Sequence, residues 1–426
     1  MRIVYVIGTS TGGVGTHVRA LARDVAAAGH EVGVIGPRAT DEHFGFSHLP
    51  GVRFAALEMG TGIGPRDAAL VIRLRALLDS FGADIVHAHG FRAGLVTFLA
   101  TRSLPDRPLF IVSLHNQAGG QGLRGRVESG IEILLAKGAD LTLGASADLV
   151  ERARSLGASG ARFAPAAAPQ VRRIPPEAAR RTREELAVEY DFDPDAVIVL
   201  SVGRVAPQKN YPMLVRALGR LTARHGLTPV DEAAGAEVNA AGTAGTAGTA
   251  RAHLTTSADD TDGTAGARHE RPELVFLVAG AADDAVLEEV RAQHRDLGTT
   301  SAVPELHFLG PRDDVAELLA AADVYVLTSV WEARALVLQE ALIAGKAIVA
   351  TRGGGTEELI GDAGVLIDSD DDLALATVVT KLAADPALRT ELGSRAAAAG
   401  ARLPDETEVA EVLLGVYSEL KSAQVG

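Results

Sequence analysis

The sequence contains no cysteine among its 426 residues. Disulfide bridges and thiolate metal sites are therefore excluded, and cysteine usage says nothing about the redox compartment. Lysine is almost as rare, so arginine supplies nearly all of the positive charge and a lysine inside a motif carries information. The five lysines are Lys137, Lys209, Lys346, Lys381 and Lys421.

Positive charge is in deficit overall, with a formal net charge of −14 at pH 7. This argues against general nucleic-acid binding, which normally shows a basic surface, although a local basic patch stays open. Long apolar runs are also missing, and none approaches the length of a membrane span. The apolar part of the N-terminal segment MRIVYVIGTS is too short for a signal peptide, so we expect a first strand and a soluble, cytoplasmic protein.

Hydrophobic residues make up 47% of the chain, which is enough for sizeable cores, and the length suggests two domains or three. Short β-branched runs alternate with longer amphipathic runs, which is typical of parallel, doubly wound α/β sheets. The alternation weakens at Phe163–Pro176, which we interpret as a linker, and then restarts. We therefore predict two tandem Rossmann-like domains at residues 1–168 and 169–405, followed by a final helix at 406–426.

The individual elements follow from the same alternation. The predicted strands are Ile3–Ile7, Val32–Ile35, Ile85–Ala88, Phe110–Leu114, Leu141–Leu143, Val197–Val202, Leu274–Ala279, Leu306–Leu309, Val324–Leu327, Ala347–Ala350 and Val365–Ile367. The predicted helices are Val14–Ala28, Asp67–Phe81, Ser146–Leu156, Met213–Arg224, Asp284–His294, Asp313–Ala321, Leu336–Ala344, Asp371–Ala384, Leu388–Ala399 and Glu406–Lys421. Residues 228–271 break the pattern with Ala, Gly, Thr and Asp, and we expect a disordered insertion there.

Two glycine-rich segments follow predicted strands and precede helices. The first is GTSTGGVGTHV at Gly8–Val18, where Gly12 and Gly13 would let a ligand approach the N-terminus of a helix, a position that favours anions. The strict G-x-G-x-x-G fingerprint is absent, so a simple tight turn stays open. The second is TRGGGTEEL at Thr351–Leu359, a possible further anion site whose glycines again allow close approach of a ligand. Its two glutamates complement a helix dipole and need no functional role.

A pair of cations lies just beyond the first strand of the second domain, in SVGRVAPQKN. Arg204 and Lys209 are five residues apart at an edge that faces the ligand crevice in open parallel sheets. Two cations there suit a diphosphate, because arginine binds phosphate oxygens bidentately and lysine acts as a point charge. Two solvated loop charges are the alternative.

Two carboxylates eight residues apart frame the segment WEARALVLQE. Glu332 falls in the predicted loop after Val324–Leu327, and Glu340 falls within the helix that follows. With one in the loop and one on the helix, both side chains can point into one cleft and accept hydrogen bonds from two sets of vicinal hydroxyls. A glutamate at a helix start and a surface glutamate are the alternative.

Histidines and acidic pairs give weaker signals. His87 and His89 share one face at a strand end, but no further metal ligands are evident, so we expect His89 to be a packed or hydrogen-bonded turn residue. His115 ends the strand in FIVSLH, where it either contacts a ligand or caps a helix. We expect His17 to be structural, and likewise the D-x-D strings at Asp191–Asp193 and Asp368–Asp370.

Together these segments resemble the retaining glycosyltransferases of the GT-B fold, family 4. The segment HFLGPRDDVAELLAAADVYVLTSVWEARALVLQEALIAGKAIVATRGGGTEELI resembles the family's E-x7-E region, and SVGRVAPQKN resembles its G-R-x4-K motif. GGVGTHV resembles the N-terminal glycine loop, and SLH the strand-end histidine. The resemblance implies two Rossmann-like domains that face each other across a cleft, with the last helix crossing back to the first domain.

The resemblance also implies roles for individual residues. Arg204 and Lys209 would neutralise the donor diphosphate, Glu340 would accept the ribose hydroxyls, and Glu332 and His115 would contact the transferred sugar. The region Gly310–Arg312 would frame the base. The donor-binding set is then Gly12, Gly13, Arg204, Lys209, Gly310, Arg312, Glu332, Ala333, Arg334, Ala335, Leu336 and Glu340, and the catalytic set is His115, Arg204, Lys209 and Glu332.

The activity that this resemblance implies is transfer of a hexose from a UDP- or GDP-sugar, with retention, to a glycolipid, a glycan or a small metabolite. No metal or other cofactor is expected, and no nucleic-acid partner, whereas weak peripheral contact with the inner face of a membrane stays open. Two residues depart from the family pattern: Ala333 stands where glycine is usual, and Ala335 stands where glycine or proline is common.

Three other classes of protein are alternatives to this one. A sugar-nucleotide epimerase of the same fold would bind the nucleotide without needing a cleft for a second substrate. A non-catalytic sugar-binding protein would be expected to be exported. A tandem Rossmann dehydrogenase fits less well, because the pyrophosphate fingerprint and its acidic ribose partner are incomplete.

Overall fold

The computed structural model describes residues 1–60, 67–117, 122–168, 170–221, 273–300 and 303–425. The predicted insertion at 228–271 lies outside the described residues. The chain divides into two compact units. The N-terminal unit comprises Met1–Gln170, Ala333–Leu336 and Pro404–Gly426, and the C-terminal unit comprises Val171–Glu332 and Val337–Leu403.

The N-terminal unit is built on a seven-stranded parallel sheet in the order β3-β2-β1-β4-β5-β6-β7. The central strands are apolar along nearly their whole length because helices cover both faces, as in β1, where only the first residue is exposed. The strand order reverses between β1 and β4. The strands are β1 (Arg2–Ile7), β2 (Glu31–Gly36), β3 (Val52–Ala56), β4 (Ile85–His89), β5 (Leu109–Leu114), β6 (Leu141–Gly144) and β7 (Ala161–Phe163).

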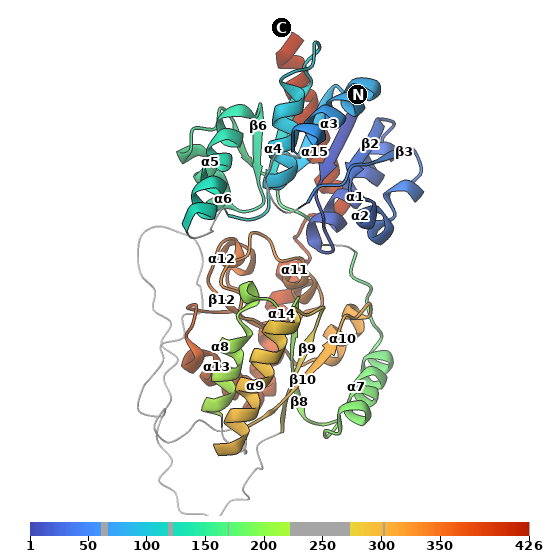
Figure 1. The fold of residues 1–426 in the computed structure, drawn as a ribbon. Helices are drawn as coiled ribbons and strands as arrows, with labels where there is room; N and C mark the ends of the chain where they lie inside the picture. Colours follow the sequence, from blue (N-terminus) through green and yellow to red (C-terminus); the bar gives the residue numbers. More distant parts are fainter. Residues whose placement is uncertain (61–66, 118–121, 169, 222–272, 301–302, 426) are drawn as a thin grey trace, which may run out of the picture. The chain divides into compact units, whose positions relative to one another are not determined.

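Helices connect these strands, and a long helix from the C-terminus completes the unit. They are α1 (Gly13–Ala27), α2 (Arg38–Phe44), the 3-10 turn η1 (Phe46–His48), α3 (Asp67–Phe81), α4 (Phe91–Thr101), α5 (Gly122–Gly138), α6 (Ala147–Ser155) and α15 (Glu406–Val425). Figure 1 shows α15, in dark red, among the blue and cyan elements of this unit. The sequence predicted β1, β2, β4, β5 and β6 to within one residue at each end.

Helix α15 is part of the N-terminal core. Its buried stripe of Val409, Ala410, Leu413 and Tyr417 has helical spacing and joins the apolar cluster that includes Tyr5. Three ion pairs fix its exposed sides, Arg23–Glu406 at 3.0 Å, Arg162–Glu419 at 2.6 Å and Lys421–Asp84 at 3.2 Å. The last helix therefore contributes to the stability of a unit whose seven strands all lie before Gln170.

The C-terminal unit has a six-stranded parallel sheet in the order β10-β9-β8-β11-β12-β13. Its order reverses between β8 and β11. The strands are β8 (Val197–Val202), β9 (Leu274–Ala279), β10 (Glu305–Gly310), β11 (Val324–Leu327), β12 (Ala347–Thr351) and β13 (Val365–Ile367), and all six were predicted.

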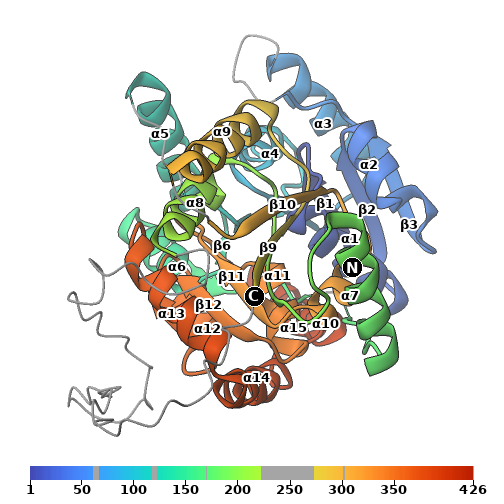
Figure 2. The same cartoon turned by 90° about the horizontal axis from the view of Figure 1, so that it is seen from below.

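Helices also cover the second sheet. They are α7 (Pro176–Tyr190), the 3-10 turn η2 (Pro207–Lys209), α8 (Tyr211–Arg220), α9 (Asp284–Thr300), α10 (Val315–Ala321), α11 (Leu336–Ile343), α12 (Thr356–Ile360), α13 (Asp372–Ala384) and α14 (Pro386–Gly400). Figure 2 shows α8 beside α9, and α8 also packs against α13. Their apolar faces bury Met213, Leu214, Val290 and Leu382 against strands that include Val199 and Val326.

Helices α2 and α4 were not predicted, and four further unpredicted elements have weak local signals. Strand β3 is an edge strand that is only half buried, so its pattern VRFAA lacks a clear apolar face. Helix α5 contains Gly125 and Gly130, which lower helix propensity. Strand β7 is only three residues long and ends where the predicted linker begins. Helix α7 lies just beyond that linker, where Pro176 stands at its first position.

Candidate donor-binding site

The candidate site of the C-terminal unit lies where the strand order reverses, at the carboxyl ends of β8 and β11. Ligands of open parallel sheets bind at this point, because the loops after the two strands diverge there. The loop after β8 contains Arg204 and Lys209, and the loop after β11 contains Glu332. The topology therefore brings together the cations and one carboxylate that the sequence analysis selected.

Hydrogen bonds join the two loops. The backbone N–H of Val330 donates to the carbonyl oxygen of Gln208 at 2.9 Å, and the side-chain amide of Gln208 donates to the carbonyl of Trp331 at 2.9 Å. The hydroxyl of Thr328 donates to the carbonyl of Lys209 at 2.7 Å. These contacts hold the two loops in one fixed arrangement beneath Lys209 and Glu332.

Lys209 and Glu332 form an ion pair, with Nζ 2.7 Å from Oε1. Their side chains are 16% and 12% exposed, so the pair is largely shielded from water. Gly203 makes room for it, because a Cβ atom at that position would lie 2.9 Å from Cε of Lys209. The ammonium group is thus held over the end of β8.

Arg204 differs from Lys209 in its surroundings. Its side chain is exposed, and no hydrogen bond or ion pair holds it within the described ranges. The neighbouring Val205 is buried and forms a bridge with Ala282, which fixes the backbone beside Arg204. The guanidinium group is therefore available to an anion without first losing a protein partner.

Glu340 lies one turn into α11, and its side chain is mostly buried. Burial raises the pKa of this carboxyl above its usual value, because the charged form is poorly solvated there. No hydrogen bond or ion pair of the carboxylate is formed with the described residues. A buried carboxylate without a partner is costly and is more often found at functional sites than elsewhere.

The second glycine-rich segment supports the Glu332 loop. A bridge joins Glu332 to Gly354, and the N–H of Gly355 donates to the carbonyl of Glu332 at 2.8 Å. Gly354 has a φ of +61°, and a Cβ atom there would collide with the carbonyl oxygen of Glu332. The glycines of this segment suggest close approach of a ligand, whereas at Gly353 and Gly354 it is the chain itself that approaches closely.

The region expected to frame the base is held by internal contacts. Gly310 has a φ of +70°, and its carbonyl accepts the N–H of Gly280 at 2.8 Å. Arg312 binds both carboxylate oxygens of Asp314, at 2.7 and 2.5 Å. The hydrogen bond to Asp314 is the main cause of the raised pKa of Arg312, so this guanidinium already has a carboxylate partner.

The segment Ala333–Leu336 groups with the N-terminal unit. Ala333 and Ala335 are buried, and Arg334 and Leu336 are partly buried. Leu336 is the first residue of α11. In sequence, these four predicted donor-binding residues interrupt the C-terminal unit, which resumes at Val337.

The D-x-D strings have structural partners. Asp191 has a φ of +57° and caps the end of α7, and Asp193 accepts the N–H of Asp195. Asp370 accepts hydrogen bonds from Asn210 and Arg216, each at 3.0 Å. These contacts agree with the structural interpretation of both strings.

The remaining predicted residues belong to the N-terminal unit. Gly12 caps α1 and Gly13 begins it, at the end of the loop that follows β1, where this sheet reverses its order. Gly12 has an extended conformation and no atom near its missing side chain. His115 directly follows β5 and is partly exposed.

His115 is one of four histidines that contact each other, an arrangement that the sequence analysis did not foresee. Nδ1 of His89 lies 3.1 Å from Nε2 of His115, and the two rings are stacked. His17 meets both rings edge-on. Burial is the main cause of low pKa values, about 3 for His17 and about 4 for His115, so these imidazoles are neutral at pH 7.

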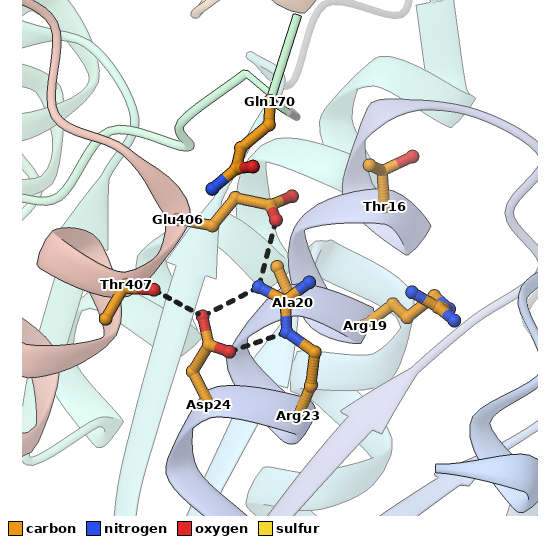
Figure 3. A pocket seen from close by; sticks show the side chains of 8 residues that line it. All are labelled: Thr16, Arg19, Ala20, Arg23, Asp24, Gln170, Glu406 and Thr407. Atoms are coloured by element: carbon orange, nitrogen blue, oxygen red, sulfur yellow. Dashed lines mark hydrogen bonds and ion pairs between the residues drawn. The ribbon is translucent and has the colours of Figure 1, made fainter. Parts of the chain in front are cut away.

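A separate polar cavity of about 490 Å³ lies between α1 and the start of α15. Figure 3 shows Arg23 between Asp24 and Glu406, which it contacts at 2.6 and 3.0 Å. Thr16, Arg19, Gln170 and Thr407 complete the lining. Arg23 pairs with both carboxylates, so the charged groups of this cavity already have partners. The ion pair between Arg23 and Glu406 joins α1 to α15.

Two further properties of the described residues bear on partners. No group of three or more His, Asp or Glu side chains in the described ranges is arranged to hold a metal ion. Each helix in the same ranges is too short or too polar to span a bilayer.

Comparison with protein families matches both units. Residues 12–167 match the model of the glycosyl transferase 4-like domain, and residues 264–385 match that of glycosyl transferases group 1. The chain thus belongs to the family 4 glycosyltransferases, which have the GT-B fold of two parallel-sheet α/β domains.

Two relatives show how far the sequence similarity extends. The chain is 42% identical over 91 residues to the N-acetyl-alpha-D-glucosaminyl L-malate synthase of Bacillus anthracis, covering 21% of this chain and 24% of that protein. It is 31% identical over 163 residues to the D-inositol 3-phosphate glycosyltransferase of Corynebacterium jeikeium (strain K411), covering 37% and 38%. The matches thus span well under half the length of these relatives.

Solved structures match over nearly the whole chain. Anabaena Alr3699/HepE, in complex with UDP and glucose, has a TM-score of 0.72 at 17% identity and covers 98% of this chain and 99% of its own. Sucrose-phosphate synthase from Thermosynechococcus elongatus has a TM-score of 0.74 at 19% identity, covering 99% and 100%. At these identities the likeness establishes the fold alone.

Proposed function

We propose that the protein transfers a hexose from a UDP- or GDP-sugar to a hydroxylated acceptor, with retention of configuration and without a metal. The observation that carries the proposal is the grouping of Arg204, Lys209 and Glu332 at the switch point of the second sheet, with the unpaired carboxylate Glu340 on the adjoining helix. Cations and carboxylates at one strand edge suit a ligand that has both phosphates and hydroxyls.

Each residue has a proposed contact with the donor. Arg204 and Lys209 bind the diphosphate, and Gly310–Arg312 border the base. Glu340 accepts hydrogen bonds from the ribose diol, which would give its buried carboxylate the partners that it lacks. Glu332 contacts the transferred sugar and keeps Lys209 in position through the 2.7 Å ion pair.

The N-terminal unit supplies the other proposed contacts. His115 is a neutral hydrogen-bond partner for the transferred sugar, since burial lowers its pKa to about 4. Gly12 leaves the N-terminus of α1 open to the donor, where the helix dipole favours an anion, and Gly13 begins that helix. The segment Ala333–Leu336 completes the proposed donor contacts.

The proposed reaction breaks the bond between C1 of the sugar and the diphosphate oxygen. A bond then forms between C1 and the acceptor oxygen on the same face, and the acceptor proton passes to the departing diphosphate. The products are the glycoside and the nucleoside diphosphate. Arg204 and Lys209 stabilise the charge that develops on the leaving group, a type of stabilisation that usually exceeds other catalytic effects.

The proposal is tested by incubating the full chain with radiolabelled UDP- and GDP-sugars, alone and with candidate acceptors. The names of the relatives suggest small hydroxylated anions as the first acceptors to try, because L-malate and D-inositol 3-phosphate appear among them. Release of nucleoside diphosphate together with a labelled product is expected. An epimerised donor sugar would support the epimerase instead, and binding of sugar without turnover would support a binding protein.

A further inference from the structure

The bond between His89 and His115 has two arrangements, because each neutral imidazole carries one hydrogen. Either Nδ1 of His89 donates to Nε2 of His115, or Nε2 of His115 donates to Nδ1 of His89. The two arrangements differ in what they leave at the other nitrogen of each ring. The surroundings of His89 distinguish them.

His89 is only 3% exposed, and its Nε2 has no hydrogen-bond partner among the described residues. Tyr5, His17 and His87 surround this ring. If His89 accepted the bond at Nδ1, its own hydrogen would sit on Nε2 as a buried donor without an acceptor. If His89 donates from Nδ1, Nε2 holds only a lone pair, and buried unpaired acceptors are more common than buried unpaired donors.

Neighbouring His87 cannot serve as a hydrogen-bond partner for Nε2 of His89, because both ring nitrogens of His87 already have partners. Its Nδ1 lies 2.6 Å from the hydroxyl of Tyr417, and its Nε2 lies 2.7 Å from the hydroxyl of Ser113. His87 thus stays in place between α15 and β5, stacked on His89 at 4.2 Å between ring centres. This contact, together with the bond to His115, fixes the orientation of the His89 ring.

We infer that His89 is a positioning residue, which donates its Nδ1 hydrogen to Nε2 of His115 and thereby holds His115 as the tautomer with its hydrogen on Nδ1. That nitrogen makes no hydrogen bond with the described residues, and His115 is partly exposed. His115 then presents an N–H donor at the end of β5. The catalytic consequence rests on the proposed function, in which this N–H meets an oxygen of the transferred sugar.

The tautomer itself is tested by NMR, independently of any activity. Long-range 1H–15N correlation spectra of the 15N-labelled full chain at pH 7 show which nitrogen of each imidazole carries hydrogen, and His115→Phe identifies the His115 signals. The wild type should have hydrogen on Nδ1 of His115, and His89→Leu should give a mixture of tautomers. Hydrogen on Nε2 in the wild type, or an unchanged tautomer in His89→Leu, would overturn the inference.

Two further variants separate positioning from a purely structural role. His89→Asn keeps an N–H donor near the place of Nδ1, so it should retain the wild-type tautomer of His115 even if His89→Leu folds poorly. Tyr5→Phe is the matched control, because it changes the same surroundings without touching the bond between the two histidines. It should leave both the tautomer and the melting temperature close to the wild type.

Kinetics with the nucleotide-sugar donor then test the consequence. His89→Leu should lower kcat/KM by about five- to tenfold, the order expected when one hydrogen bond in the transition state is weakened. His89→Asn should recover most of the loss. Equal losses in both variants would mean that His89 acts only through packing. If no nucleotide sugar is turned over by the wild type, the proposed function fails while the NMR result still decides the tautomer.

Discussion

The ammonium nitrogen of Lys209 lies 2.7 Å from a carboxylate oxygen of Glu332, although 123 positions separate the two residues in the chain. The cation proposed to bind phosphate is thus held by the carboxylate proposed to bind sugar. When a donor binds, the ammonium group of Lys209 either exchanges Glu332 for a phosphate oxygen or donates hydrogen bonds to both. Arg204, in contrast, has no protein partner to lose within the described residues.

This difference predicts separate effects for the two cations. Arg204→Ala should lower kcat/KM for donor turnover by about 10²–10³-fold, the range for losing one group that stabilises developing charge, and leave the melting temperature unchanged. Lys209→Met should lower turnover similarly but also destabilise the fold by about 1–3 kcal/mol, because Glu332 becomes a shielded carboxylate without a cation. Thermal melts and initial rates measure both effects.

The double variant is the control for the Lys209 result. Lys209→Met combined with Glu332→Gln should recover most of the lost stability, because no unpaired charge remains, while turnover stays low. A double variant no more stable than Lys209→Met would show that the ion pair contributes little to the fold.

Glu332 and Glu340 should differ in their effects on nucleotide affinity. Glu340→Ala should weaken the binding of UDP or GDP by about 1–3 kcal/mol, the value of a hydrogen bond to a charged group. Glu332→Ala should not weaken it, because Lys209 is then released from its ion pair, but should lower turnover of the intact sugar donor. Calorimetry with the bare nucleoside diphosphates gives the affinities. Equal losses in both variants would contradict the division of roles.

The buried carboxyl of Glu340 predicts a pH dependence of stability. Burial raises its pKa in the fold, so the folded chain binds this proton more tightly than the unfolded chain does. Its contribution to stability is therefore full below the unfolded pKa and is lost as the pH rises through the higher folded pKa. Above the folded pKa the carboxylate is charged and poorly solvated, so Glu340→Gln should raise the melting temperature there by a few degrees.

The same substitution should have no such effect at low pH. Below the unfolded pKa of a glutamate, near 4.5, both the carboxyl and the amide are neutral, and the two proteins should melt alike. Thermal melts of both proteins from about pH 3.5 to about pH 7.5, a range that spans the ordinary glutamate pKa, measure the difference in melting temperature. If the Glu340→Gln variant has a lower melting temperature than the wild type at pH 7, the carboxylate has a stabilising partner.

The backbone conformation of Gly354 predicts that this position does not tolerate a side chain. Gly354→Ala places Cβ against the carbonyl of Glu332 in a left-handed conformation, so the loop must shift and donor turnover should fall at least tenfold. Gly130→Ala is the matched control, since a Cβ there meets nothing within 4 Å in the exposed part of α5. It should raise stability by about 0.4–1 kcal/mol. Denaturant melts and rates compare the two.

Helix α15 supplies the last prediction. Tyr417 is fully buried, and its hydroxyl lies 2.6 Å from His87, so Tyr417→Ala should cost about 3–5 kcal/mol through a cavity and a lost hydrogen bond. Val412 is on the same helix but 65% exposed, and Val412→Ala should change stability by less than about 0.5 kcal/mol. Urea unfolding of both variants measures the difference. Similar values would show that α15 packs loosely.

The sequence by itself determined the architecture of this protein to a large extent. Runs such as Ile3–Ile7 and Val324–Leu327 are apolar throughout because strands of a parallel sheet are covered on both faces, and this burial leaves a local pattern. The sequence also placed Arg204, Lys209, Glu332 and His115 at strand ends. The edge strand β3 escaped prediction because a half-buried strand has no such pattern.

The tertiary structure alone decided which of these residues contact each other. Lys209 meets Glu332 because β8 and β11 are neighbours in the sheet, and His89 meets His115 because β4 and β5 are neighbours. Strand order depends on packing between distant segments, which local periodicity does not record. The burial that raises the pKa of Glu340 and lowers that of His115 has the same origin, since desolvation depends on what the whole fold places around a side chain.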